Sequence, residues 1–250
     1  MKVAGLVLAA GRGSRLDPVT ADRPKALIEI AGRTLLSRQL EALGAAGADE
    51  IAVVTGWCAD RVEATGIPTI HNPDWSTGSM VESLLCADRV LNKADLTVIV
   101  YGDIVVRPRD VQRVASARGD IRIAYDPLWA AMWSIRSDDP LADAETFQID
   151  RADQVTEIGS RPRSMNEVEG QYVGVLAITR TAWSNLAELA MRGARDMTGL
   201  LSTAITYRPG SVVGVAIDGP WWEFDTAADL RLGKPVVRTI DAESRGASEN

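Results

Sequence analysis

The sequence predicts an α/β fold in which a mostly parallel, mixed sheet is flanked by helices and carries a smaller inserted β/α layer. Three observations lead to this prediction. Strand-like and helix-like runs alternate through the first half of the chain, as in successive βαβ units. The run at 96–101 is rich in Val and Ile, as expected of a central strand covered on both faces. Beyond residue 120 the strand-like runs become shorter and look more antiparallel, which indicates the inserted layer.

The first half of the chain opens on an apolar run at 3–8 that predicts a buried strand. The segment at 34–47 has leucines at helical spacing and ends on Gly47, a residue that favours the C-cap position, so we expect an amphipathic helix there. The elements expected next are strands at 51–55, 68–71 and 96–101 and a helix at 80–91.

The second half begins with a strand-like run at 121–125 and a tryptophan-bearing segment at 127–135. The later elements expected are strands at 146–149, 155–158, 172–178 and 212–217 and helices at 182–192, 199–205 and 227–233. With no internal repeat or linker visible, we expect one domain over 1–238. The polar residues at 239–250 predict a flexible tail.

Composition excludes several classes of protein. The net charge of −7 argues against a nucleic-acid binder, which would carry a basic face. No apolar run approaches the length of a membrane span, and the first residues show no signal segment, so we expect a cytoplasmic protein with no membrane partner. The two cysteines and the single His71 are too few for a disulfide framework, a zinc site or a Cys–His nucleophilic pair.

A glycine-rich turn directly after the first strand suggests a phosphate site. It reads Ala9-Ala10-Gly11-Arg12-Gly13-Ser14-Arg15-Leu16, and Arg23-Pro24-Lys25 follows. Glycine lets backbone N–H groups approach a phosphate closely, because it has no Cβ and tolerates positive φ. Arg15 can grip two oxygens through its guanidinium fork, while Lys25 supplies a movable point charge. The pattern therefore predicts a nucleoside triphosphate site.

Two further groups of residues follow strands that end at the same edge of such a sheet. Tyr101-Gly102-Asp103 closes the central strand, and Trp221-Trp222-Glu223-Phe224-Asp225 follows a late one. Mg²⁺ prefers a few carboxylates together with phosphate oxygens and water, so Asp103 and Asp225 are the candidate metal ligands. An aspartate at a strand end also serves as a turn or helix-cap residue, and this interpretation of Asp103 stays open.

The residues at 8–16 together with Pro24-Lys25 resemble the signature of the nucleotidyltransferases that make nucleoside-diphosphate sugars and related activated compounds. The resemblance covers residues 1–235 and implies a Rossmann-like fold. It also implies magnesium-dependent transfer of a nucleotidyl group from a nucleoside triphosphate to a phosphate, with release of pyrophosphate. It supports Asp103 and Asp225 as magnesium ligands and Arg15 and Lys25 as catalytic phosphate-binding residues.

Within that superfamily the chain looks like the cytidylyltransferase branch that activates phosphocholine, phosphonates and phosphoglutamine. Asn72-Pro73-Asp74-Trp75 and the segment at 78–84 carry this resemblance, with Ser79 where the branch commonly has asparagine. Trp222-Glu223-Phe224-Asp225-Thr226 matches its late metal-binding motif. The implied reaction transfers CMP from CTP to a small phosphonate or phosphomonoester, such as 2-aminoethylphosphonate, 2-hydroxyethylphosphonate, phosphocholine or an amino-acid phosphate.

The candidate site residues fall into two groups. Those assigned to the nucleotide are Leu8, Ala9, Ala10, Gly11, Arg12, Gly13, Ser14, Asn72, Ser79, Ser83 and Tyr101. Those assigned to the acceptor, on the inserted layer and the late strand, are Trp129, Trp133, Glu145, Glu169, Gln171, Tyr172, Trp222 and Glu223. Aromatic rings with carboxylates suit an amine or a quaternary ammonium. Arg136, Arg161 and Arg163 could instead bind a carboxylate or phosphonate, and each tryptophan could simply be a core residue.

Two other functions remain as alternatives at this stage. One is a sugar-1-phosphate nucleotidyltransferase that uses UTP, dTTP or GTP. The other is a regulator that binds a nucleotide without turnover. The sequence is compatible with a homodimer and does not identify the acceptor.

Overall fold

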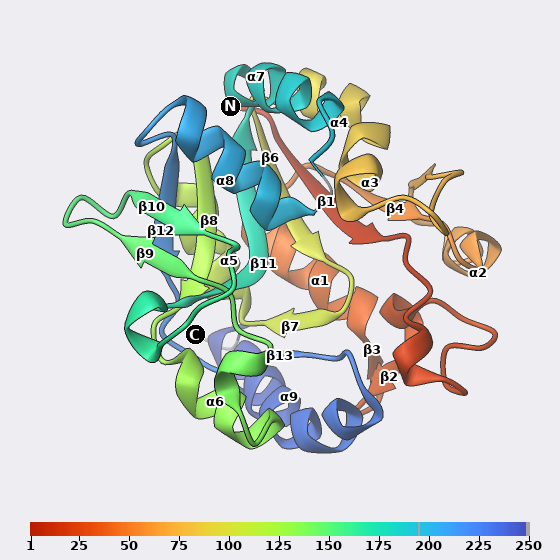
Figure 1. The fold of residues 1–250 in the computed structure, drawn as a ribbon. Coiled ribbons are helices and arrows are strands. Elements are labelled where there is room, and N and C mark those ends of the chain that lie inside the picture. The colour runs from red at the N-terminus through yellow and green to blue at the C-terminus, as the bar shows by residue number, and fades with distance from the viewer. Residues whose placement is uncertain (195, 249–250) are drawn as a thin grey trace.

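The computed structural model describes residues 1–194 and 196–248, and a seven-stranded sheet crosses the centre of that part of the chain (Figure 1). Its strand order is β12-β8-β11-β6-β1-β4-β5. These strands are β1 (Val3–Ala9), β4 (Glu50–Thr55), β5 (Thr69–His71), β6 (Leu96–Tyr101), β8 (Ile121–Asp126), β11 (Gln171–Thr179) and β12 (Val212–Ala216).

The sheet is mixed but mostly parallel, which confirms the fold class predicted from the sequence. β1 pairs in parallel with both β4 and β6, β4 with β5, and β12 with β8. The exception is β11, which is antiparallel to its neighbours β6 and β8. Its register shifts between Tyr172 and Leu176, where Gly174 has φ +80°. A Cβ at Gly174 would lie 2.7 Å from the Tyr101 ring, so the glycine makes room for that ring.

Two apolar cores lie on opposite faces of the sheet, because alternate residues of each strand point to opposite sides. In β6, Val98 and Val100 join one core, while Ile99 joins the other. The first core packs α1 (Leu35–Ala45), α5 (Pro108–Ser116), α6 (Trp129–Arg136) and α9 (Ala227–Ser248). The second packs α3 (Met80–Cys86), α4 (Asp88–Lys93), α7 (Arg180–Met191) and α8 (Met197–Tyr207). The short helix α2 (Ala59–Glu63) follows β4.

Smaller strand pairs lie beside the main sheet. The hairpin of β9 (Phe147–Ile149) and β10 (Val155–Ile158) projects at its left in Figure 1 and belongs, with α6, to the layer inserted between β8 and β11. β7 (Ile104–Val106) pairs with β13 (Trp221–Glu223), and β2 (Glu29–Ile30) with β3 (Arg33–Thr34). The β7–β13 ladder fixes a late segment of the chain next to the end of the central strand β6.

The structure corrects two of the predicted elements. The helix expected at 80–91 is divided into α3 and α4 at Ala87. The flexible tail expected beyond Arg238 is wrong as far as Ser248, since α9 continues through it. Ile240 is buried, and the buried Asp241 accepts a hydrogen bond of 2.6 Å from Arg38 Nη2 of α1, so this helix is anchored to the body of the protein. Residues 249–250 lie outside the described residues.

Among the helices of residues 1–194 and 196–248, none combines the length and the apolar character needed to cross a membrane.

Candidate active site

The carboxyl ends of β1 and β6 lie directly against each other. The Gly102 N–H donates a 2.8 Å hydrogen bond to the Leu8 carbonyl, and a Cβ at Gly102 would lie 2.8 Å from the Ala9 Cβ. Any larger residue would push the two strand ends apart. The Phe224 N–H donates to the Asp103 carbonyl at 2.9 Å, which brings the segment after β13 to the same place. Asp103 and Asp225, far apart in sequence, thereby face one point.

Lys25 occupies that point. Its Nζ lies 2.7 Å from Asp225 Oδ1 and 3.2 Å from Asp103 Oδ2, and all three side chains are mostly buried. Burial alone would lower the pKa of Lys25, but the two carboxylates outweigh it, so the pKa is raised and the ammonium stays charged. The exposed Arg15 also pairs with Asp225. The structure therefore brings together the four residues that the sequence assigned to catalysis and metal binding.

Gly13 lets the lysine reach the carboxylates. Gly13 has φ +68°, and a Cβ there would lie 2.4 Å from Lys25 Cε, so the lysine stem runs across the glycine. The buried Thr20 fixes this turn by donating from its hydroxyl to the Gly13 carbonyl at 2.9 Å. The glycine-rich turn thus has a second role besides close approach to phosphate: it leaves the space in which Lys25 lies.

Gly13→Ala should therefore displace Lys25. We expect kcat to fall by about tenfold or more, because a contact made in the transition state is lost. Initial rates of pyrophosphate release would measure the effect. Gly32→Ala is the matched control, since Gly32 also has a positive φ (+83°) but a Cβ there meets nothing within 4 Å. It should lose stability without losing kcat, and an equal loss of kcat in both variants would contradict the steric explanation.

A first cavity of about 180 Å³ opens beside Lys25. It is lined by Leu8, Ala9, Ala10, Gly11, Gly13, Lys25, Ala26, Trp75, Gly78, Ser79, Met80, Ser83, Gly102 and Asp103. Lys25 and Asp103 form its charged end. Trp75, which sequence reasoning missed as a site residue, adds an aromatic wall, and a Cβ at Gly56 would lie 2.3 Å from the Trp75 Cβ. That glycine after β4 was the available signal.

The predicted nucleotide residues divide between this cavity and the surrounding scaffold. Arg12, Ser14, Asn72 and Tyr101 do not line it. Arg12 pairs with Asp17 and lies over the Trp57 ring. Asn72 is buried and donates to Ser83 Oγ at 3.0 Å, so it supports the cavity wall from behind. Ser79 lines the cavity, but its hydroxyl caps α3 in a capping box with Glu82.

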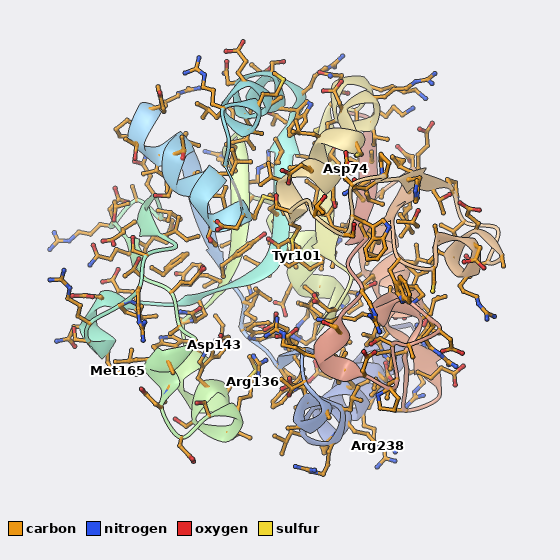
Figure 2. The ribbon with its side chains drawn as sticks, turned by 45° about the vertical axis from the view of Figure 1, so that its right-hand side comes forward. Asp74, Tyr101, Arg136, Asp143, Met165 and Arg238 are labelled. Carbon is orange, nitrogen blue, oxygen red and sulfur yellow. The ribbon has the colours of Figure 1, made fainter. Side chains whose placement is uncertain are left out.

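A second cavity, of about 300 Å³, lies on the other side of Tyr101 and Asp225. Figure 2 shows Tyr101 near the centre of the molecule, with Asp143 and Arg136 of the inserted layer below it. The lining residues are Arg15, Met80, Tyr101, Ile104, Trp133, Asp143, Glu145, Gln171, Tyr172, Val173, Gly174, Asp196, Met197, Thr198, Trp221, Glu223 and Asp225. Tyr101 packs edge-on against Tyr172, with ring centroids 5.7 Å apart. It therefore belongs to this cavity and not to the first.

Five of the eight predicted acceptor residues line this second cavity: Trp133, Glu145, Gln171, Tyr172 and Glu223. Trp129, Trp222 and Glu169 do not. Trp129 is buried and donates from Nε1 to the Val168 carbonyl at 3.0 Å. Trp222 packs on α9, where a Cβ at Gly233 would lie 2.4 Å from its ring. Glu169 accepts a hydrogen bond from the Ile149 N–H at the β9 hairpin.

The second cavity is rich in carboxylates. Burial raises the pKa of Glu145, and repulsion from Asp196 and Asp143 adds to the shift. Desolvation raises the pKa of Glu223 to about 7, and the negative charge of Asp103 contributes as well. The aspartate that sequence reasoning missed, Asp196, also caps α8 through the Gly199 N–H. In the sequence, Asp196 is recognisable only as an aspartate directly before a helix, and such a position predicts a helix cap.

The two carboxylates suit a magnesium ion whose other ligands are phosphate oxygens and water. Asp103 and Asp225 are hard oxygen donors, and they already share one cation, the Lys25 ammonium. Within residues 1–194 and 196–248 there is no group of three or more His, Cys, Asp or Glu side chains placed to hold a metal. Two carboxylates without a complete protein cage are typical of Mg²⁺ sites, where substrate phosphates and water supply the other ligands.

Comparisons with known proteins identify relatives of this chain. The chain is 31% identical over 249 residues to the CTP:phosphoglutamine cytidylyltransferase of Campylobacter jejuni, covering 91% of this chain and 97% of that protein. It is 33% identical over 245 residues to the bifunctional IPC transferase and DIPP synthase of Rubrobacter xylanophilus, covering 94% of this chain but 52% of that protein. This chain thus spans about half the length of that second relative.

The fold is also found in solved structures. The CTP:phosphocholine cytidylyltransferase from Streptococcus pneumoniae superposes with a TM-score of 0.72 at 16% identity, covering 95% of this chain and all of that one. The MobA-like NTP transferase domain matches residues 5–204, which include the glycine-rich turn, Lys25 and Asp103. The chain therefore belongs to the MobA-like NTP transferase family and is a nucleotidyltransferase.

Proposed function

We propose that this chain transfers CMP from CTP to a small acceptor bearing a phosphate or phosphonate, and releases pyrophosphate. The observation that carries the proposal is the position of Lys25, Asp103 and Asp225 between the two cavities, close enough to serve a nucleotide in one and an acceptor in the other. The relative that is 31% identical over nearly its whole length bears the name of a cytidylyltransferase, which favours CTP as the nucleotide.

In the proposed reaction the protein contributes positioning and charge. The acceptor oxygen is already anionic near neutral pH, so no strong general base is needed. Lys25 neutralises charge between the α-phosphate and the acceptor, and Arg15, whose side chain is 69% exposed, binds the departing pyrophosphate. Asp103 and Asp225 would hold Mg²⁺, which when bound neutralises phosphate charge and orients the reacting groups.

A panel of nucleotides and acceptors tests this function. Pyrophosphate release would be measured with CTP, UTP, dTTP and GTP, each combined with phosphonates, phosphocholine, an inositol phosphate and a hexose 1-phosphate. We expect CTP with a small phosphate or phosphonate to give the highest kcat/KM. Preference for UTP or dTTP with the hexose phosphate would overturn the proposal. Binding of CTP without release of pyrophosphate in the presence of any of these acceptors would instead make the chain a regulator.

We further propose that the acceptor carries a positively charged group. The second cavity is lined by three further carboxylates, Asp143, Glu145 and Asp196, and repulsion from the two aspartates contributes to the raised pKa of Glu145. Trp133 and Trp221 add aromatic faces to the same cavity. Carboxylates and aromatic faces together attract an ammonium group, whereas an uncharged polyol gains little from them.

Glu145→Gln tests this acceptor class. We expect KM for 2-aminoethylphosphonate to rise by about tenfold, which corresponds to about 1.4 kcal/mol and suits a partly buried charge pair. KM for 2-hydroxyethylphosphonate, which has a hydroxyl in place of the ammonium, should stay nearly constant. Glutamine can still accept the hydrogen bond of 3.2 Å from Thr198 Oγ1, so the fold is preserved.

Glu169→Gln is the matched control for that variant. Its carboxylate accepts from the Ile149 N–H and lies outside the cavity, so neither KM should change. If Glu145→Gln raises both KM values equally, the residue shapes the cavity without selecting charge, and the cationic acceptor is contradicted.

A further inference from the structure

Arg136 joins the inserted layer to the segment that holds Asp225. It ends α6, and its side chain is only 10% exposed. Its Nη1 lies 3.2 Å from Glu223 Oε2, and its Nε donates to Asp229 Oδ1 at 3.0 Å. Its guanidinium also lies over the Trp133 ring, 5.3 Å from the centroid. One side chain thus contacts a wall of the second cavity and the start of α9.

Asp229 connects Arg136 to the backbone at Asp225 through hydrogen bonds. Its Oδ2 accepts hydrogen bonds from the Asp225 N–H at 3.2 Å, the Thr226 N–H at 2.8 Å and the Thr226 hydroxyl at 2.8 Å. The side chain is 3% exposed, so its charge needs a partner inside the protein, and Arg136 is that partner. Without the guanidinium, a buried carboxylate would remain unpaired directly beneath the loop that presents Asp225.

Arg136 also neutralises Glu223. That carboxylate lines the second cavity together with Asp225, and its Oε2 lies 3.2 Å from Arg136 Nη1. Without this pair, the Glu223 side chain would lose a contact that fixes it two residues before Asp225. The guanidinium fork can contact Glu223 and Asp229 together because its N–H groups point in fixed, separate directions.

We propose that Arg136 is a positioning residue for Asp225, acting through Asp229, and that it sets the divalent-metal affinity of the site. The inference rests on the proposed magnesium-dependent transfer, and it adds a residue of the inserted layer to the support of the metal site. Because Arg136 lies over the Trp133 ring and supports Asp225 through Asp229, we expect the acceptor cavity and the metal site to be energetically linked.

The test measures metal binding apart from turnover. Mn²⁺ would be titrated into the protein in the presence of CTP and without acceptor, with free Mn²⁺ followed by its electron paramagnetic resonance signal. We expect Arg136→Gln to raise the Kd for Mn²⁺ by about tenfold or more. The Kd for CTP measured in EDTA should change by less than about twofold, because Arg136 does not line the first cavity.

Two further variants complete the test. Arg136→Lys keeps the charge but not the fork, so we expect an intermediate Kd for Mn²⁺, and it carries the test if the glutamine variant does not fold. Arg38→Gln is the matched control: Arg38 pairs with Asp241 at 2.6 Å in an equally buried contact on the same helix α9, away from the site. It should lower Tm and leave the Kd for Mn²⁺ unchanged.

An Arg136→Gln protein that binds Mn²⁺ as tightly as the wild type would overturn the inference. Equal weakening in Arg38→Gln would also overturn it, because a general loss of stability would then explain the effect. Wild-type protein that binds Mn²⁺ with CTP but releases no pyrophosphate would contradict the proposed function alone. Wild-type protein that binds no Mn²⁺ with CTP would contradict the metal site and the role of Arg136 together.

Discussion

Asp103→Asn is expected to lower kcat for pyrophosphate release by about a thousandfold. Asparagine has the same shape as aspartate but no charge, so one of two carboxylates that converge on a single cation is lost. Lys25 would remain paired with Asp225 alone, and a divalent ion would lose half of its protein ligands. The measurement is the initial rate at saturating CTP and acceptor over a range of Mg²⁺ concentrations.

The fold should survive this substitution, because Asp103 holds the Phe224 N–H through its backbone carbonyl and not through its side chain. Circular dichroism and Tm would establish this. Asp60→Asn, at an exposed position of α2, is a control that should change neither rate nor Tm. If Asp103→Asn retains near-normal activity at millimolar Mg²⁺, Asp103 is a turn residue and not a metal ligand.

Lys25→Ala is expected to lower kcat by about a hundredfold while changing KM for CTP much less, since its charge is needed where bonds exchange. The same variant should bind Mg²⁺ more tightly in the absence of nucleotide. Its ammonium occupies the space between the two carboxylates, so removing it ends a competition between two cations. Steady-state kinetics would measure the loss of kcat. Titration of the nucleotide-free protein with Mn²⁺ would measure the gain in metal affinity.

Lys93→Ala serves as the comparison for Lys25→Ala, because Lys93 is an exposed lysine that pairs with the exposed Glu50. The Lys93→Ala variant should change neither kcat nor the affinity for the divalent ion. A Lys25→Ala variant whose only change is a higher KM for the acceptor would make Lys25 a uniform-binding residue. Unchanged metal affinity in that variant would contradict competition between the ammonium and the ion.

Much of the fold and the central part of the site could be predicted from the sequence because their signals are local. The apolar runs that became β1 and β6 are continuous in sequence, and the glycine-rich turn lies directly after one of them. Parallel strands end at one edge, so the turn after β1 and Asp103 after β6 are expected to lie together. The structure places Lys25 against Asp103 although 78 residues separate them.

The remainder depended on contacts that no local pattern records. Tyr101 was assigned to the nucleotide from its place beside Asp103, but its side chain turns to the second cavity, where Gly174 in the irregular part of β11 leaves room for it. Trp129 and Trp133 lie one helical turn apart on α6, yet only Trp133 faces the second cavity. Composition alone could not separate them.

The C-terminal segment shows the same limit. Its polar residues predicted a tail, because an amphipathic helix with one narrow buried stripe has the composition of a solvated segment. The pairing of Asp241 with Arg38 joins positions 203 residues apart and is invisible in sequence. The burial of Ile240 likewise depends on how the helix lies against the rest of the protein.

The pairing of β13 with β7 has a consequence for how the molecule becomes functional. Synthesis of the chain produces Lys25, Asp103 and the strand ends at the first cavity well before it produces β13 and Asp225. A nascent or truncated polypeptide that stops before this ladder would hold only one of the two carboxylates. Such incomplete products are expected to lack nucleotidyl transfer, because one of the two carboxylates that converge on Lys25 is missing.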